Sequence, residues 1–263
     1  LDDEVVGKEA VKLYEDATQM LQDIITNQWL KAKAVIGIWP ANTVNFDSIE
    51  VYDPTDSGKV IHQFECLRQQ VKKAAGQPNL SLADFIAPKE SGRKDYIGGF
   101  AVTAGIGIER HIERFEKNHD DYSIIMIKAL ADRLAEAFAE LMHAKVRKDF
   151  WGYARREKLT NEELIKEKYR GIRPAAGYPA CPDHTEKPGL FELLNATEHT
   201  GITLTESFAM YPASSVSGLY FASAHSKYFG VGRVAKDQVR SIAERKGMDF
   251  AIMEKWLASN LNY

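Results

Sequence analysis

The sequence predicts an α+β fold: one domain over residues 1–263, with a largely antiparallel sheet, packed helices and one long central helix. Helical apolar patterns outnumber strand patterns along the chain. The strand patterns are neighbours in sequence and do not alternate with helices, which favours antiparallel pairing. Apolar residues make up 44% of the 263 residues, enough for a substantial core, and no break in composition divides the chain.

Charge and cysteine content narrow the class of protein. The formal net charge of −3 gives no general drive toward nucleic acid or an anionic membrane. No apolar run approaches the roughly 20 residues of a membrane-spanning helix. Cys66 and Cys181 show no metal-type pairing, which is typical of reduced thiols in a reducing compartment. The N-terminal LDDEVVG is acidic and lacks an initiator Met, so we expect an excised piece of a longer chain and no signal peptide.

The first elements are expected to be a helix followed by three strands. A buried strand is predicted at 33–39 and should stop at Pro40. Segments 48–52 and 59–66 flank the turn sequence DPTDSG and predict an antiparallel hairpin. The opening helix is predicted over residues 4–30 by apolar residues at steps of three and four, namely Val6, Ala10, Leu13, Ala17, Leu21 and Ile24.

A loop-rich segment at 77–94 separates the hairpin from the next strand, which is predicted at 96–103. That strand leads into AGIGIERHIERF, the start of a helix. Gly105 and Gly107 match only part of a dinucleotide-binding fingerprint, because Arg110 takes the place of the third glycine. No alternating strand–helix series surrounds them, so we reject a Rossmann methyltransferase.

The longest helix is predicted over 121–146. Its Asp132 and Glu136 lie one turn apart and could act together on a cation, although pairing with nearby basic residues on a solvated face is favoured by spacing alone. In the hairpin, His62 has no second ligand at a useful spacing, so a structural role is favoured over metal binding, and Cys66 is expected to be a small core residue. The buried stripe of the long helix is predicted to be Ile124, Ile127, Ala131, Leu134, Phe138 and Leu141.

The second half is expected to combine short helices with short strands. Thr160 and Glu163 form a capping box that starts a helix ending near Tyr169. Thr185 is expected to cap another helix that runs to Leu194. Three strands are predicted at 204–210, 216–221 and 227–234, and two closing helices at 236–246 and 249–257.

A proline-rich stretch, RPAAGYPACPDHTEK at Arg173–Lys187, is the strongest candidate for a site, and we name it the proline loop. Its prolines set the backbone shape, and such stiffness reduces the entropy lost on binding. Arg173 offers a planar fork for a carboxylate, while Ala175 and Gly177 leave the backbone accessible and Tyr178 adds a flat face. The alternative is a plain connector whose arginine sits in a surface ion pair. The density of special residues favours a binding loop for a small charged molecule.

Cys181 and His184 lie within this loop at a C-x-x-H spacing. They could supply two zinc ligands, but no second pair lies nearby. They could also form a nucleophile and its base, although Pro182 between them makes the geometry uncertain. A structural role, or a polar contact at a pocket rim, is the favoured interpretation.

The segment RGIRPAAGYPACPDHTEK resembles the activation domain of cobalamin-dependent methionine synthase. The resemblance continues in KALADRLAEAFAE at 128–140, in LTESFAM and VSGLYF within 204–221, and in SKYFGVG at 226–232, and so covers nearly the whole chain. It implies a single curved α+β domain that binds S-adenosylmethionine in a groove beside the sheet.

The same resemblance implies roles for individual residues. Arg173 would bind the ligand's carboxylate, and Glu136 would face its ammonium or sulfonium. Ala175 and Gly177 would offer backbone contacts near the adenine and ribose, with Tyr178 near the methyl group. Tyr228 and Phe229 would close the pocket, although without the resemblance their sequence would suggest alternate in-and-out packing on a strand. Glu167 and His184 are weaker candidates.

The family pattern also has an acidic ligand for the ammonium group, which would fall before Leu1. Asp2, Asp3 and Glu4 are not convincing replacements, so we expect this chain to hold the ligand more weakly than an intact domain.

The reaction implied by the resemblance is the reductive methylation of cob(II)alamin, in which S-adenosylmethionine supplies the methyl group. Cobalamin would sit in another domain of the parent chain, docking over Tyr178 with help from Asp132. Flavodoxin or a flavoprotein reductase would donate the electron, zinc would belong to the parent enzyme only, and the location would be cytoplasmic. The reactive methyl donor needs mainly positioning, so no catalytic residue is predicted and the chain alone should turn nothing over.

Two other functions stay open at the level of sequence. The chain could be a stand-alone interaction module whose proline loop binds a protein partner, or a thiol or metal protein that uses Cys181 and His184. An S-adenosylmethionine-dependent rise in melting temperature would separate the first from the activation domain. Metal analysis, or alkylation of Cys181 near neutral pH, would test the second.

Overall fold

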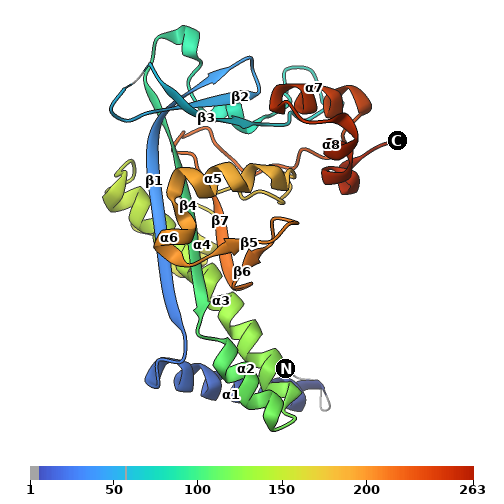
Figure 1. Cartoon of the computed structure of the whole chain (residues 1–263). Coiled ribbons are helices and arrows are strands. Elements are labelled where there is room, and N and C mark those ends of the chain that lie inside the picture. The colour runs from blue at the N-terminus through green and yellow to red at the C-terminus, as the bar shows by residue number, and fades with distance from the viewer. Residues whose placement is uncertain (1–5, 57) are drawn as a thin grey trace. The chain divides into compact units, whose positions relative to one another are not determined.

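The computed structural model describes residues 6–56 and 58–263 (Figure 1). The expected helix start at residue 4, and the side chains of Asp2, Asp3, Glu4 and Val6, lie outside that part of the chain. The described residues fall into two compact units. Unit 1 lies within Leu1–Ala34, Val102–Leu141 and Thr197–Val216, and unit 2 within Val35–Ala101, Met142–Ala196 and Ser217–Tyr263. That the whole chain acts as one domain stays a prediction.

A five-stranded sheet confirms the α+β prediction. Its strand order is β3-β2-β1-β4-β7. The predicted hairpin is present, because β2 pairs antiparallel with β3 from Ser48 opposite Glu65. A separate two-stranded antiparallel sheet joins β5 to β6. The strands are β1 (Lys31–Val44), β2 (Ser48–Tyr52), β3 (Val60–Glu65), β4 (Asp95–Ile106), β5 (Thr203–Leu204), β6 (Met210–Tyr211) and β7 (Ser215–Tyr220).

Strand β1 runs through Pro40, so the prediction that this proline stops the strand is wrong. Pairing with β2 begins one residue later, with Ala41 opposite Val51. The missing N–H of Pro40 therefore breaks no bond of that ladder. A tight turn at Asn45 and Phe46, both with positive φ, then leads into β2.

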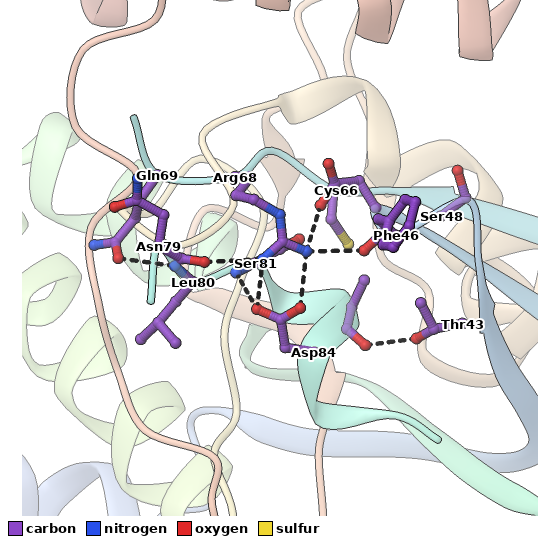
Figure 2. A network of polar contacts seen from close by, with 12 residues as sticks. Thr43, Phe46, Ser48, Cys66, Arg68, Gln69, Asn79, Leu80, Ser81 and Asp84 are labelled. Carbon is purple, nitrogen blue, oxygen red and sulfur yellow. Dashed lines mark hydrogen bonds and ion pairs between the residues drawn. The ribbon is translucent and has the colours of Figure 1, made fainter. Parts of the chain in front are cut away.

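Arg68 helps to hold the long loop after β3 in place (Figure 2). Arg68 donates two hydrogen bonds to the Asp84 carboxylate, at 2.7 and 2.8 Å, and one to the Phe46 carbonyl at 3.0 Å. Asp84 also accepts from the backbone N–H of Ser81 at 2.8 Å. The expected loop-rich segment is thereby confirmed and given a defined shape, with short 3₁₀ turns at Leu82–Phe85 and Lys89–Ser91.

In unit 1, helix α1 (Val6–Thr26), helix α2 (Glu109–Lys117) and the first part of α3 (Asp121–Lys145) share a core. The predicted stripes are only partly right: Leu13 is 53% exposed and Leu141 is 51% exposed. The core meets α1 only along its second half, which leaves Leu13 uncovered. The core members are Met20, Ile24, Ile108, Phe115, Met126, Ile127 and Ala131.

In unit 2 the two closing helices are confirmed as α7 (Lys236–Lys246) and α8 (Phe250–Trp256). The capping box of Thr160 and Glu163 is confirmed at α4 (Asn161–Ile165), which ends earlier than expected. Thr185 is not a cap: its N–H is accepted by the Asp183 side chain at 2.8 Å, at the start of a 3₁₀ turn before α5 (Lys187–Leu194).

Two predicted strands differ in the structure. Segment 204–210 is a short hairpin, because 205–209 turns the chain between β5 and β6. Segment 227–234 forms no strand, and only Val234 makes a bridge, to Leu261. Helix α6 (Ala196–Thr200) precedes the hairpin. In the described part of the chain, no helix has the length and apolarity needed to cross a membrane.

Candidate functional site

The proline loop starts as an extension of the sheet in unit 2. Ile172 and Phe221 exchange two backbone hydrogen bonds of 3.0 Å, and Leu219 donates to the Pro174 carbonyl at 2.9 Å. This close approach requires a glycine on β7, because a Cβ on Gly218 would lie 2.5 Å from the Pro174 oxygen. The loop backbone is therefore fixed from its first residues, as the prolines predicted.

Further along, the loop closes on itself through backbone hydrogen bonds. Gly177 donates to the Cys181 carbonyl at 2.7 Å, and Cys181 donates to the Tyr178 carbonyl at 2.9 Å. Gly177 has a φ of +93°, in the left-handed region that favours glycine. Tyr178 stands out from this turn with 57% of its surface exposed.

Arg173 is braced by two tyrosines. Its backbone N–H donates to the Tyr228 hydroxyl at 3.0 Å, and its Nη1 donates to the Tyr169 hydroxyl at 3.1 Å. The two hydroxyl oxygens lie 3.1 Å apart. Because Tyr169 accepts from Arg173, its own proton is available to Tyr228. A closed ring of hydrogen bonds thus ties the Arg173 guanidinium to the Arg173 backbone.

A buried histidine lies on the other side of this guanidinium. His143, near the end of α3, is fully buried, and its Nδ1 lies 3.4 Å from Arg173 Nη1. Its Nε2 lies 3.4 Å from the Tyr153 hydroxyl. Burial, and then the nearby Arg147 and Arg173, lower the pKa of His143 to about 2, so the ring is neutral at physiological pH.

A buried ion pair lies beneath the tyrosine that meets Arg173. Arg147, in the π-helical turn Val146–Phe150, is fully buried and makes a bidentate pair with Glu157 at 2.8–3.0 Å. Its guanidinium lies 4.4 Å from the centre of the Tyr169 ring. Sequence reasoning missed Arg147, His143 and Tyr169. The one available signal was the four-residue spacing of His143 and Arg147 at the end of the long helix.

Tyr228 and Phe229 are both half-buried, so the alternate in-and-out packing of a strand does not occur. Tyr228 contacts the site through its hydroxyl, as described. Phe229 packs on the core cluster beside α7 and α8 and meets Phe85 edge to face at 6.2 Å. A direct contact of either ring with a ligand stays a prediction.

The weaker candidates lie within the proline loop or shortly before it. The His184 ring packs directly against Gly177, since a Cβ there would lie 2.1 Å from His184 Cε1, and burial lowers the pKa of His184. Burial raises the pKa of the Cys181 thiol strongly, which opposes a nucleophilic role. Glu167 is exposed, with a positive φ just after α4. Among the described residues, no group of three or more His, Cys, Asp or Glu is placed to hold a metal ion.

The predicted acidic residues Asp132 and Glu136 belong to unit 1. Both are exposed on α3. Asp132 accepts a hydrogen bond from the Ser214 hydroxyl at 2.9 Å, within the same unit. Whether Glu136 joins the proline loop of unit 2 in one ligand site stays a prediction.

Comparison with known proteins identifies a family and a solved structure that this chain resembles. The family described as vitamin B12 dependent methionine synthase, activation domain, matches residues 1–247. A crystal structure of the MetH reactivation domain bound to AdoHcy matches with a TM-score of 0.94 and 55% sequence identity. That match covers 100% of this chain and 80% of the other.

Proposed function

This chain belongs to the activation-domain family of vitamin B12 dependent methionine synthase, and we propose from this membership that it binds S-adenosylmethionine and presents it for reductive methylation of cob(II)alamin. One observation carries the proposal: the similar reactivation domain holds AdoHcy, at 55% identity over the whole of this chain. AdoHcy is what remains of S-adenosylmethionine after methyl transfer. The two molecules share the carboxylate, ammonium, ribose and adenine by which a protein would grip them.

The groups on the proline loop fit such a ligand. Arg173 provides a guanidinium for the carboxylate, and the Tyr169 hydroxyl helps to hold it in place. The turn at Ala175–Gly177 carries only small side chains of its own, and Gly177 is exposed. Tyr178 offers an exposed ring beside them. Glu136 would supply the negative charge that the ammonium or sulfonium requires.

The chemistry demands little else from this chain. The sulfonium is a reactive methyl donor, so holding it in line with its acceptor supplies the main rate advantage. Cobalamin, carried by another domain of the parent enzyme, would receive the methyl group after one-electron reduction by flavodoxin or a flavoprotein reductase. Tyr178 and Asp132 would contact that domain, and the complex would work in the cytoplasm.

Calorimetric titration with S-adenosylmethionine tests the proposal. We expect saturable binding by the wild type and a loss of roughly 2 kcal/mol in Arg173→Ala, because a charge-assisted bidentate pair is removed. Arg156→Ala, an exposed arginine of the same unit, is the matched control and should bind like the wild type. Unchanged affinity in folded Arg173→Ala would remove Arg173 from the site. Absence of binding both here and in the full-length parent enzyme would overturn the function.

A further inference from the structure

We propose that His143 is a positioning residue for ligand recognition, whose neutral imidazole works with Tyr169 to hold the Arg173 guanidinium in the orientation that grips the ligand's carboxylate. The inference rests on the proposed function and extends it to a residue that makes no contact with the ligand itself.

Two hydrogen-bond acceptors lie close to Arg173 Nη1. This nitrogen lies 3.1 Å from the Tyr169 hydroxyl and 3.4 Å from His143 Nδ1. A planar guanidinium with acceptors at two points has little freedom to rotate. An unheld arginine side chain would instead lose about 2 kcal/mol of rotamer entropy when it orders on a ligand. Because the two acceptors already order the Arg173 side chain in the unliganded protein, ligand binding loses less conformational entropy.

The His143 imidazole must be neutral to accept a hydrogen bond from Arg173. A neutral imidazole has one N–H donor and one acceptor nitrogen. Nδ1 faces an N–H of Arg173 and must be the acceptor, which leaves the proton on Nε2, toward the Tyr153 hydroxyl at 3.4 Å. A protonated ring would place a third positive charge beside Arg147 and Arg173. Burial keeps the ring neutral, and so keeps Nδ1 able to accept.

The His143 ring is held in place by two aromatic neighbours. The imidazole stacks on Tyr220, with centroids 5.2 Å apart and an interplanar angle of 14°. The Tyr169 ring lies nearly perpendicular to it, at 80°, with the ring centroids 4.9 Å apart. These contacts fix the plane in which Nδ1 lies. They are ring contacts that a phenyl group could reproduce, so packing alone does not explain a histidine at a fully buried position.

The experiment uses two ligands that differ by one group. Calorimetric titration compares S-adenosylmethionine with decarboxylated S-adenosylmethionine, which lacks the carboxylate that Arg173 would bind. In His143→Phe we expect about tenfold weaker binding of S-adenosylmethionine, as for one lost hydrogen bond to a charged group, and a change within about twofold for the decarboxylated ligand. Arg173→Ala should show the same selectivity with a larger loss.

Conservative variants separate positioning from packing. His143→Asn keeps an acceptor near the place of Nδ1 and should bind S-adenosylmethionine within about threefold of the wild type. His143→Gln places its amide near Nε2 and should behave like His143→Phe. His225→Phe, at an exposed histidine of the same unit, should leave both affinities unchanged. If His143→Phe does not fold, the contrast between the Asn and Gln variants decides the question.

Three results would overturn the inference. Equal losses for the two ligands would indicate a purely structural histidine, and full S-adenosylmethionine affinity in folded His143→Phe would remove its role. Equal affinities of the Asn and Gln variants would show that the acceptor position is irrelevant. A failure of the proposed function is distinguishable from these, because the wild type itself would then bind neither ligand.

Discussion

At the scale of single residues, Gly177 shows why the proline loop needs a glycine at its turn. Its φ of +93° is unfavourable for other residues, and the His184 ring occupies the space where a Cβ would stand. The sequence indicated a glycine that permits positive φ and close approach. It did not indicate that the approaching group is a side chain seven residues further along the same loop.

Gly177→Ala should therefore destabilise the protein by more than strain alone. The left-handed conformation costs an alanine about 1–2 kcal/mol, and the clash with His184 adds to this cost. Gly76→Ala is the matched control, because Gly76 also has a positive φ (+83°) but nothing within 4 Å of its Cβ position. Urea unfolding should show a larger loss for Gly177→Ala. The double variant Gly177→Ala/His184→Ala should recover part of the loss, and no recovery would assign the whole effect to the backbone.

The residues around Arg173 mark the limit of sequence reasoning at this scale. Arg173 stood out because prolines and glycine surround it. His143 and Tyr169 lie in or beside helical segments with no unusual neighbours. The sequence does not distinguish a buried histidine on a helix from other inward-facing residues of that helix. Only the fold brings His143 within 3.4 Å of Arg173, across 30 residues of chain.

At the scale of elements, the end of helix α7 is tied to the rest of unit 2 by two basic residues. Arg245 pairs with the Glu65 carboxylate and donates to the Cys66 carbonyl at 3.0 Å. Lys246 pairs with Asp183 at 2.9 Å and with Glu186. The end of the proline loop is thus fastened to α7 through a largely buried group of charges.

Glu186 should make stability depend on pH. Burial raises its pKa from an ordinary 4.5 to about 7, although Lys246 acts in the opposite direction. A carboxyl whose folded-state pKa is raised binds its proton more tightly in the folded state than in the unfolded state. This proton binding stabilises the fold fully below pH 4.5, and the stabilisation is lost as the pH rises through 7. We expect the free energy of unfolding of Glu186→Gln, relative to that of the wild type, to rise over this window by at most about 3 kcal/mol.

Chemical denaturation at pH 5 and at pH 7.5 would measure this difference. Glu192→Gln removes an exposed carboxylate on helix α5, which begins directly after Glu186, and this control should track the wild type. Parallel pH profiles of the wild type and Glu186→Gln would contradict the assignment.

Helices were predicted better than strands at this scale, for a physical reason. Helices α7 and α8 follow from local signals, such as Asp249, whose side chain accepts from the backbone of Ala251 and Ile252. Segment 227–234 contains the β-branched and aromatic residues typical of a strand, but its Val231 and Val234 are buried in the cluster with α7 and α8. Burial against these helices accounts for the apolar content of the segment, and none of the described strands pairs with it.

At the scale of the whole molecule, the antiparallel sheet was predictable because its hairpins are local in sequence. The strand order was not, because placing β4 between β1 and β7 depends on contacts between distant parts of the chain. The candidate site residues are likewise far apart in the sequence: Asp132 and Glu136 lie in unit 1, and the proline loop lies in unit 2. Family resemblance, and no local pattern, is what linked them into one ligand site.

Tyr178 is expected to act between domains, so its role is best tested in the parent enzyme. Its side chain is 57% exposed at the tip of the loop turn, where a docking domain could cover it. Tyr178→Ala should lower the rate at which reductant and S-adenosylmethionine reactivate the full-length enzyme by tenfold or more, because positioning is lost. The affinity of the isolated chain for the ligand should change by less than about threefold.

Tyr96→Ala makes the comparison specific, since Tyr96 is another exposed tyrosine of unit 2, on β4. It should alter neither the reactivation rate nor the affinity. If Tyr178→Ala reactivates as fast as the wild type, the ring does not take part in docking. If rate and affinity fall together, Tyr178 is a ligand contact only, and the proposed contact with the cobalamin domain would have to be tested elsewhere, beginning with Asp132.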